Sequence, residues 1–342
     1  MSEPFEIAGG TQSRVENALV RVRLRDKTIG WGECAPLPAF NGETQASTLA
    51  AVRRAASALV GRDAARPLDV ARALEKTLGR RGAARAGLEM AALDAWGRRT
   101  RMPLWAYFGG AERSVATDVT VAIVPPRQAA AAARRILSLG IRTIKVKVGK
   151  DVDGDIARVL AVAGAAPKAS LILDANQGYL AKDALAALTR LRRRGVRPVL
   201  FEQPVAKDDW DSMAKVDREG GVPVAADETV SGRDDVWRLA KKRAASVVNV
   251  KLMKYGIAEA AEVAATARAA GLGLMIGAMI ESPLALACAA QFAAGLGGFR
   301  FVDLDTSLWF ARHPMRGLTF GKGGVYDVAT VRAGVGVEPR GT

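Results

Sequence analysis

Histidine and cysteine are scarce in this sequence, and their scarcity disfavours several kinds of active site. His313 is the only histidine in 342 residues, which argues against a histidine-built metal site and a Ser/His/Asp triad. The two cysteines, Cys34 and Cys288, form no Cys-x-x-Cys motif, so buried thiols are expected rather than a zinc ribbon or a disulfide framework. If the chain is an enzyme, we expect Lys, Asp or Glu to carry its protons.

Long hydrophobic runs are also missing. The longest, from Ala269 to Ile280, is shorter than the roughly 20 residues that a membrane span requires. The opening segment, MSEPFEIAGG, contains neither the basic stretch nor the apolar core of a signal peptide. We therefore expect a soluble, cytoplasmic protein with no membrane partner. The sequence carries no signal for the oligomeric state, and a homo-oligomer is left open.

Acidic residues are outnumbered by basic ones, 35 to 50, which gives a formal net charge of +15. Basic surfaces attract nucleic acid because they neutralise phosphate. The basic residues here, however, are mostly arginines spread along Ala-rich helical segments, and no nucleic-acid-binding motif accompanies them. We expect solvated helix faces and no nucleic-acid partner.

From about residue 115 onward, short β-branched runs alternate with helical stretches, a pattern typical of successive βα units. Eight strands are predicted, at residues 118–123, 143–148, 170–176, 198–203, 223–227, 246–252, 272–279 and 299–305. Helices are predicted at 127–139, 153–165, 182–194, 234–243 and 257–270. A closed barrel is the simplest interpretation. A doubly wound sheet is the alternative, but Gly271 and Gly273 precede a strand, whereas dinucleotide-binding glycines follow one.

The first 112 residues have a different pattern. A hairpin is predicted at 19–24 and 29–33, and helices at 44–60 and 85–98. We therefore predict an α/β fold in three parts. These are an N-terminal α+β capping domain (1–112), a TIM-type (β/α)8 barrel (113–305), and a C-terminal segment (306–342) that packs back on the capping domain.

Charged and amide side chains stand near the carboxyl end of almost every predicted barrel strand, where buried apolar residues would be ordinary. Residues two apart share a face of a strand, so the set contains four pairs of side chains that each lie on one face. Buried charges are costly unless they are paired or bind a metal. Because catalytic residues of barrels gather at this end, we interpret the set as an active site. It comprises Lys145 and Lys147, Asp174 and Asn176, Glu202, Asp227, Asn249 and Lys251, Glu281, and Asp303 and Asp305.

Three carboxylates come from three consecutive strands. Asp174, Glu202 and Asp227 can therefore converge on one hard cation that prefers oxygen ligands, and Mg²⁺ fits best, at one ion per subunit. Asn176 and Glu228 are expected to support these ligands, the first from the same strand face and the second as the neighbour of a ligand.

Two lysines are predicted to face each other. The second and sixth strands of an eight-stranded barrel lie opposite one another, which places Lys147 and Lys251 on two sides of a bound molecule. Lys145, as a like-charged neighbour, is expected to lower the pKa of Lys147 toward a value useful for a base. Such a pair can remove a proton from one face of a carbon and return one to the other face, while Mg²⁺ stabilises the enediolate. This is the chemistry of a racemase or an epimerase.

Asp303 and Asp305 end the eighth strand, across the barrel from the predicted metal site. They would repel each other unless a cation lies between them, and a substrate ammonium group is a natural partner. Capping of the following segment by one of the two is the alternative. Glu281 is a further candidate for substrate binding, whereas Ser282-Pro283 is expected to begin a helix. Lys254 is the alternative to Lys251 if the sixth strand ends later than predicted.

The same residues, in the same order, resemble the enolase superfamily and its muconate-lactonizing-enzyme-like subgroup. The resemblance spans nearly the whole chain, and it implies a modified (β/α)7β barrel. It also implies Lys147 and Lys251 as the acid/base pair, with Mg²⁺ on Asp174, Glu202 and Asp227. It is carried by Trp31-Gly-Glu33, Asn41-Gly-Glu-Thr44, Lys145-Val-Lys147, Asp174-Ala-Asn176, Glu202-Gln-Pro204, Asp227-Glu228, Asn249-Val-Lys251, GAMIES at 277–282 and Asp303-Leu-Asp305.

The motif Asp303-Leu-Asp305 is similar to that of dipeptide epimerases, where it holds the substrate amino group. A dipeptide is therefore the expected small-molecule substrate. Members selective for Ala-Glu carry an arginine in the N-terminal loop, and this chain has Gly9-Gly10 there, with Arg14 a few residues later. Ala-Glu is therefore not assigned. The alternatives are o-succinylbenzoate synthase or N-acylamino acid racemase activity, which need no ammonium pocket, and a non-catalytic basic binding module.

Overall fold

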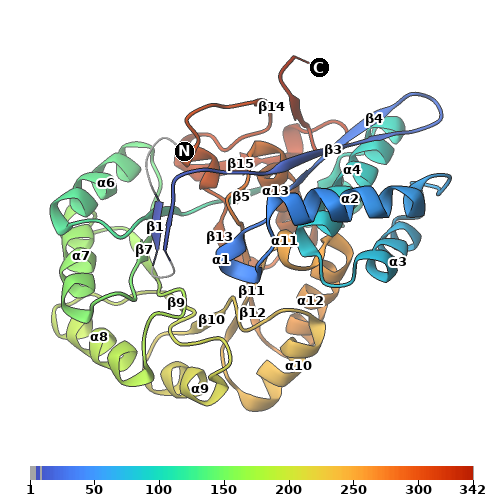
Figure 1. The fold of residues 1–342 in the computed structure, drawn as a ribbon. Helices are drawn as coiled ribbons and strands as arrows, with labels where there is room; N and C mark the ends of the chain where they lie inside the picture. The colour runs from blue at the N-terminus through green and yellow to red at the C-terminus, as the bar shows by residue number, and fades with distance from the viewer. Residues whose placement is uncertain (1–4, 8–9, 342) are drawn as a thin grey trace.

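An eight-stranded parallel sheet forms the centre of the molecule. The structure is a computed structural model, and it describes residues 5–7 and 10–341. The sheet pairs neighbours in chain order from β6 to β13, and Figure 1 looks into the ring that the strands and helices form. Its strands are β6 (Val119–Val121), β7 (Thr143–Lys147), β8 (Ser170–Asp174), β9 (Leu200–Glu202), β10 (Val224–Ala226), β11 (Val247–Val250), β12 (Gly273–Gly277) and β13 (Phe299–Asp303).

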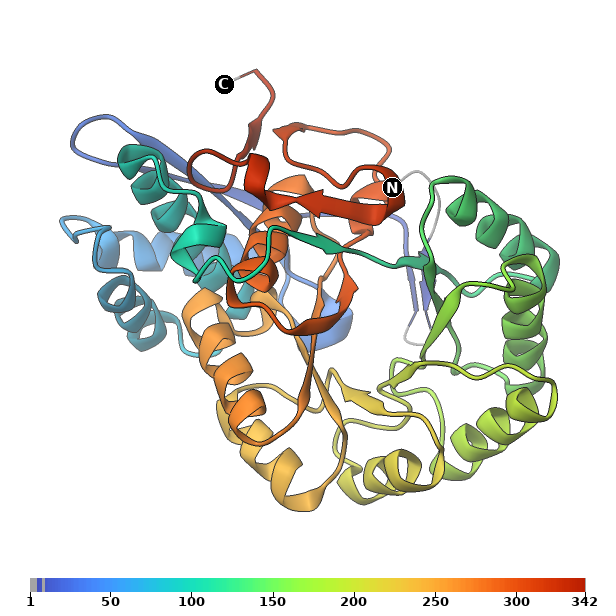
Figure 2. The same cartoon turned by 180° about the vertical axis from the view of Figure 1, so that it is seen from behind.

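Helices cover the outside of this sheet. In both Figure 1 and Figure 2 they form an outer ring that runs from green through yellow to orange. Each of the first seven strands is followed by a helix, whereas β13 is followed by the 3₁₀ turn η1 (Thr306–Trp309). The predicted (β/α)7β fold is thereby confirmed. The helices are α6 (Pro126–Ser138), α7 (Val152–Ala165), α8 (Ala181–Arg193), α9 (Trp210–Glu219), α10 (Arg233–Lys242), α11 (Leu252–Tyr255), α12 (Ile257–Ala269) and α13 (Pro283–Leu296).

The inside of the barrel is apolar directly below the predicted site. One cluster of buried side chains contains a single residue from each of six consecutive strands, β8 to β13. Each of these residues lies two positions before an inward-facing residue at the end of its strand or, for Ala225, just past it, so the side chains share a face. The barrel therefore has an apolar layer that supports a charged layer at its carboxyl end. The apolar layer consists of Ile172, Leu200, Ala225, Val247, Met275 and Phe301.

The N-terminal residues form a hairpin and helices beside the barrel. Strands β3 (Ala18–Arg23) and β4 (Ile29–Cys34) pair antiparallel, as predicted. Gly30 and Gly32 of β4 lie directly against the backbone of helix α4 (Gly82–Thr100), where a Cβ atom would overlap main-chain atoms. Glycine is needed there so that strand and helix can approach this closely. The remaining elements are β1 (Phe5–Ile7), β2 (Gly10–Gln12), α1 (Pro38–Asn41), α2 (Gln45–Leu59), α3 (Pro67–Leu78), α4 (Gly82–Thr100), α5 (Leu104–Tyr107) and β5 (Ser114–Ala116).

The C-terminal residues contact the N-terminal helices as well as the barrel. The Leu104 N–H donates to the Gly334 carbonyl at 3.1 Å, and Arg98 of α4 pairs with Glu338 at 3.1 Å. The division of the chain into three parts remains a prediction. This segment contains β14 (Met315–Gly317), η2 (Lys322–Gly324), β15 (Val325–Asp327), η3 (Val328–Thr330) and β16 (Val337–Pro339), and β15 pairs with β5.

Both cysteines are free and buried, as expected. Among the residues that the structure describes, none of the helices is long and apolar enough to cross a membrane.

Candidate active site

A cavity of about 360 Å³ lies at the carboxyl end of the barrel. Its volume falls in the range of roughly 300–1,000 Å³ that is typical of small-molecule sites. Eight of the residues predicted from the sequence line it, together with Thr120 and apolar residues of the α1 region. The eight are Lys145, Lys147, Asn176, Asp227, Glu228, Lys251, Asp303 and Asp305.

The three predicted metal ligands end or follow consecutive strands. Asp174 and Glu202 are direct neighbours in the β8–β9 register, and Asp227 follows β10. All three side chains are buried. Burial and the nearby Asp174 carboxylate raise the pKa of Glu202 to about 7. Burial opposes ionisation of Asp174 too, but Lys145 and Lys147 more than offset it and hold the pKa of Asp174 well below its usual value. Such a concentration of buried carboxylates requires cationic compensation.

The chain's own ammonium groups provide compensation in this structure. Lys145 Nζ lies 2.9 Å from Asp174, 2.6 Å from Glu202 and 2.6 Å from Asp303. With the side chains so placed, the described residues include no group of three His, Cys, Asp or Glu arranged to hold a metal directly. The donor set itself fits Mg²⁺, since it consists of converging carboxylate oxygens without sulfur or imidazole. The assignment of the three ligands remains a prediction.

Lys147 and Lys251 approach the cavity from β7 and from the end of β11, four strands apart in a sheet of eight. Lys147 Nζ contacts Asp174 at 2.6 Å and Asn176 Oδ1 at 2.9 Å. Lys251 Nζ contacts Asp227 at 2.7 Å. Burial disfavours the charged form of Lys251, but Asp227 and Glu202 outweigh it and raise the pKa of this lysine. Each opposed lysine is thus held by a predicted metal ligand.

Lys145, predicted to tune Lys147, is fully enclosed by carboxylates. Burial lowers its tendency to carry a charge, but Asp174, Asp303 and Glu202 raise its pKa well above the ordinary value. Lys145 and Lys147 share Asp174 Oδ2 as a partner. The predicted effect of Lys145 on the basicity of Lys147 remains a prediction.

Asp303 and Asp305 both line the cavity, and a third aspartate lies with them. Asp303 contacts Lys145, and Asp305 Oδ2 accepts the Thr120 N–H at 2.7 Å. Burial and the charge of Asp303 raise the pKa of Asp305 to about 7. Asp118 is also buried, and burial together with Asp303 raises its pKa well above the usual value. Sequence reasoning missed Asp118 because it begins the predicted strand 118–123, whereas the site was predicted from residues at the carboxyl ends of strands. Its spacing of two from Thr120 could have placed it on the inner face.

The predicted supporting residues contact the predicted ligands. Asn249 Nδ2 donates to Glu202 at 2.7 Å, and the Asn176 N–H donates to Asp174 at 3.0 Å. Asn176 Nδ2 also lies 3.5 Å from Glu228 Oε1. Burial and Asp227 raise the pKa of Glu228 to about 8.

Three other predicted residues have contacts away from the cavity. Glu281 is buried, is not among the residues that line the cavity, and accepts the Met279 N–H at 2.8 Å. It therefore holds its own loop, and its substrate contact stays a prediction. Ser282 caps α13 as expected. Lys254 is fully engaged with Asp227 and the Asn249 carbonyl, which makes Lys251 the lysine that faces the cavity.

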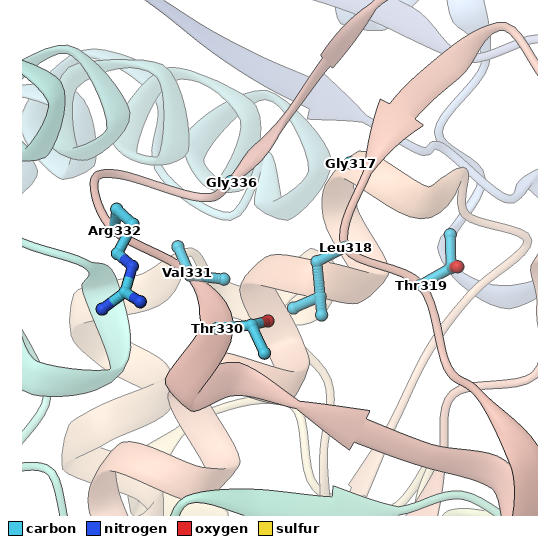
Figure 3. A pocket seen from close by; sticks show the side chains of 7 residues that line it. All are labelled: Gly317, Leu318, Thr319, Thr330, Val331, Arg332 and Gly336. Carbon is cyan, nitrogen blue, oxygen red and sulfur yellow. The ribbon is translucent and has the colours of Figure 1, made fainter.

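A second, more open cavity of about 420 Å³ lies in the C-terminal segment. Figure 3 shows Arg332 and Thr319 on opposite sides of it, with Leu318, Thr330 and Val331 between them. Its lining contains no carboxylate and no lysine, so it lacks the acid/base groups of the first cavity.

Comparison with known proteins agrees with this geometry. Residues 128–342 match the family described as enolase C-terminal domain-like, and residues 1–109 match the mandelate racemase/muconate lactonizing enzyme N-terminal domain. The chain belongs to the mandelate racemase/muconate lactonizing enzyme family. The enolase-superfamily resemblance seen in the sequence is thereby confirmed.

Relatives in this family carry related names. The aromatic dipeptide epimerase of Herpetosiphon aurantiacus is 48% identical over 339 residues, which cover 99% of this chain and 95% of that protein. The L-Ala-D/L-Glu epimerase of Bacillus subtilis is 35% identical over 314 residues, covering 90% and 85%. A crystal structure of a dipeptide epimerase from Enterococcus faecalis, complexed with Mg and L-Leu-L-Tyr, has a TM-score of 0.95 at 31% identity and covers 99% of this chain and 96% of its own. The names of the first two relatives specify different dipeptide substrates, one aromatic and the other containing glutamate.

Proposed function

We propose that this protein is a Mg²⁺-dependent dipeptide epimerase, an isomerase that inverts the α-carbon of the C-terminal residue of a dipeptide. The observation that carries the proposal is the placement of Lys147 and Lys251 on opposite sides of one cavity. Inversion at carbon removes a proton from one face and adds one to the opposite face, and a base and an acid on the two sides can do so directly. Family relatives named dipeptide epimerases, one of them in complex with Mg and a dipeptide, support the substrate class.

Asp174, Glu202 and Asp227 would hold one Mg²⁺, with Asn249 and Asn176 orienting the first two through the hydrogen bonds described above. The ion, when bound, would stabilise the negative charge that develops on the substrate carboxylate as the α-proton leaves. The carboxylates also neutralise the lysines that surround them, so the site can bind both a cation and an anionic substrate group.

The two lysines would act in sequence on the same carbon. In one direction neutral Lys147 takes the α-proton and the Lys251 ammonium donates a proton to the opposite face; in the reverse direction the roles exchange. Asp174 and Asn176 orient Lys147, and Asp227 orients Lys251, at the contacts given above. Fixed geometry of this kind removes the entropic cost of bringing acid, base and carbon together.

Asp303 and Asp305 would bind the ammonium group of the N-terminal residue of the substrate. Both line the cavity on the β13 side, and the burial of Asp303 strengthens a charge-assisted hydrogen bond because little water competes for it. An N-acylated substrate has no ammonium group to pair with these carboxylates. This is the feature that favours a dipeptide over the acylamino-acid and succinylbenzoate alternatives. Cytoplasmic location and homo-oligomerisation remain predictions.

Proton exchange at the α-carbon tests the proposal directly. The protein is incubated with Mg²⁺ and a set of L,L-dipeptides in D₂O, and deuterium incorporation is followed by mass spectrometry. We expect incorporation at the C-terminal α-carbon together with formation of the L,D epimer. Incorporation only into N-acylamino acids would favour the racemase alternative, and no exchange in either class would contradict the two-lysine mechanism.

A further inference from the structure

The cavity has two unlike walls. The charged wall comes from the barrel strands. The other wall, which we call the apolar wall, comes from the segment around α1 and from the loop after β12, and it consists of Leu37, Pro38, Ala39, Phe40, Met279 and Ile280. The side chains of this wall carry no hydrogen-bonding group. A substrate side chain that contacts it gains free energy by leaving water rather than by directed polar contacts.

Phe40 is the part of the apolar wall that lies near the reacting groups. Its ring centroid is 5.6 Å from Lys251 Nζ. A carbon that exchanges a proton with this nitrogen must come within roughly 3–3.5 Å of it. The substituents of that carbon are therefore within reach of the Phe40 ring. One of them is the carboxylate expected to bind the metal and another is the nitrogen of the peptide bond, so the side chain of the reacting residue is the substituent that is left to contact the ring.

Apart from the lysines around the reacting carbon, the described lining of the cavity offers no cation to an acidic side chain. Among the described residues that line it, the cationic ones are Lys145, Lys147 and Lys251, and each pairs with a carboxylate. The Arg14 side chain, 82% exposed, lies near Glu16 and is not part of the lining. Burying a glutamate side chain against the apolar wall would leave its charge uncompensated, which is costly.

A wall without polar contacts also suits inversion. When the α-proton moves from one face to the other, the carboxylate and the amide nitrogen stay bound, and the side chain changes its direction slightly. Hydrogen bonds would favour one of the two directions because they require defined angles. Apolar contact depends mainly on buried area, so one wall can accept both epimers.

We propose that the apolar wall binds the side chain of the residue being inverted, with Phe40 as its main contact, and that the protein is selective for dipeptides with a hydrophobic C-terminal residue. This proposal rests on the proposed epimerase function and adds the substrate side chain to it.

The experiment compares kcat/KM over a series of L-Ala-L-Xaa dipeptides in which Xaa is Ala, Leu, Phe, Lys or Glu. For the unmodified protein we expect Leu and Phe to exceed Glu and Lys by about a hundredfold or more, since burying an uncompensated charge against an apolar surface is costly. If no dipeptide in the series is turned over, the epimerase function itself fails. If all are turned over with equal efficiency, only the selectivity proposal fails.

Substitution of Phe40 locates the contact. We expect Phe40→Ala to lower kcat/KM for L-Ala-L-Phe by about tenfold while L-Ala-L-Ala changes by less than about threefold, because loss of apolar contact affects the larger side chain more. Phe40→Leu should restore most of the preference. An equal loss for every dipeptide in both variants would show that the ring acts on Lys251 instead and would overturn the assignment. Trp237→Ala, which removes a 58% exposed ring outside the cavity, is the matched control and should change nothing.

A shift of selectivity toward an acidic side chain gives a second readout. Ala39 is exposed and lines the cavity, so Ala39→Arg would place a guanidinium on the apolar wall. We expect the ratio of kcat/KM for L-Ala-L-Glu over L-Ala-L-Leu to rise by about tenfold or more, because a charge-assisted pair replaces an uncompensated charge. An unchanged ratio, with both dipeptides still turned over, would place the side chain elsewhere in the cavity.

Discussion

Two groups of buried carboxylates stabilise this molecule in different ways. Those at the barrel mouth lie close to one another and are compensated by ammonium groups, as Lys145 shows with its three partners. Those between the N-terminal elements and the rest of the chain are Glu33, Glu89 and Asp94, which we call the interface carboxylates. Each accepts a hydrogen bond from at least one backbone N–H group, none contacts a lysine among the described residues, and Asp94 also pairs with Arg98 at 2.8 Å.

The contacts of the interface carboxylates join distant parts of the sequence. Glu33 accepts the Ser282 N–H at 3.0 Å and the Ala285 N–H at 3.3 Å, at the start of α13. Glu89 accepts the Ala258 N–H at 2.8 Å, at the start of α12. Asp94 accepts the N–H groups of Trp31 and Val335, each at 2.8 Å.

This difference shows that the groups which contact a buried carboxylate indicate whether it serves catalysis or stability. Backbone N–H groups are fixed donors that cannot leave the site, whether they lie at a helix start, as for Glu33 and Glu89, or elsewhere, as for Asp94. We therefore expect a carboxylate bound by them to be structural. Carboxylates held by lysines can exchange those lysines for a metal or a substrate cation. Substitutions of the carboxylates at the barrel mouth should therefore affect catalysis, and substitutions of the interface carboxylates should affect folding.

The largest expected effect comes from removing an opposed lysine. Lys147→Ala and Lys251→Ala should each lower epimerisation by about 10³-fold or more, since acid/base groups contribute about 10²–10⁴-fold and no second group replaces either one. Each variant should still exchange the α-proton of one epimer with D₂O through the remaining lysine. Full epimerase activity in either variant would refute the mechanism, and Lys182→Ala, an exposed lysine on α8, is the control.

The next largest effect is expected at Asp303, one of the two residues proposed to bind the substrate ammonium group. Asp303→Asn should lower kcat/KM for a dipeptide by about 10–100-fold, because a charge-assisted hydrogen bond is worth about 1.5–3 kcal/mol. Residual exchange of the N-acetylated dipeptide should stay unchanged. A parallel loss for both substrates would indicate that Asp303 acts through Lys145 alone, and exposed Asp327→Asn provides the comparison.

A smaller effect, on stability, is expected from Glu33→Ala. The substitution leaves the N–H groups at the start of α13 without their acceptor, at a cost of about 2–3 kcal/mol. Urea unfolding should show a lower midpoint, while kcat of the folded enzyme changes less than about tenfold. Glu16→Ala, at an exposed side chain, should leave the midpoint in place. A catalytic loss without destabilisation would remove the distinction between the two groups.

The smallest effect is a change in pH dependence. Burial raises the pKa of Glu89 from its ordinary value of 4.5 to about 7. Between these values the unfolded chain is ionised while the folded protein keeps its proton, so Glu89 contributes stability that is lost as pH rises from about 4.5 to about 7. Glu89→Gln should flatten the unfolding free energy over this window, relative to the unmodified protein. Identical slopes would show that Glu89 is ionised in the folded state.

Local patterns in the sequence were enough to predict the barrel. All eight predicted strands are found in the sheet, but each ends one or two residues earlier than predicted. The difference has a physical reason, because residues such as Asn176 and Lys251 leave the strand ladder so that their side chains can turn into the cavity. Helix α13 shows no amphipathic period because it is buried on all sides.

Contacts between distant segments could not be predicted in the same way. The family motif Trp31-Gly-Glu33 marks Glu33 in the sequence, but only the fold shows that it caps α13. Likewise, the position of Phe40 over Lys251 depends on how the capping segment meets the barrel. The candidate ligands and lysines were predictable because barrel topology alone determines which strand ends are neighbours and which are opposite.

The apolar wall around α1 and the opposed lysines come from parts of the chain that lie far apart in the sequence. Mutation or recombination can therefore alter residues 37–40 without changing any residue that moves a proton. A lineage with this architecture can acquire a new substrate preference in few steps and keep its chemistry throughout. For protein engineering, a small library at these four positions samples specificity separately from rate.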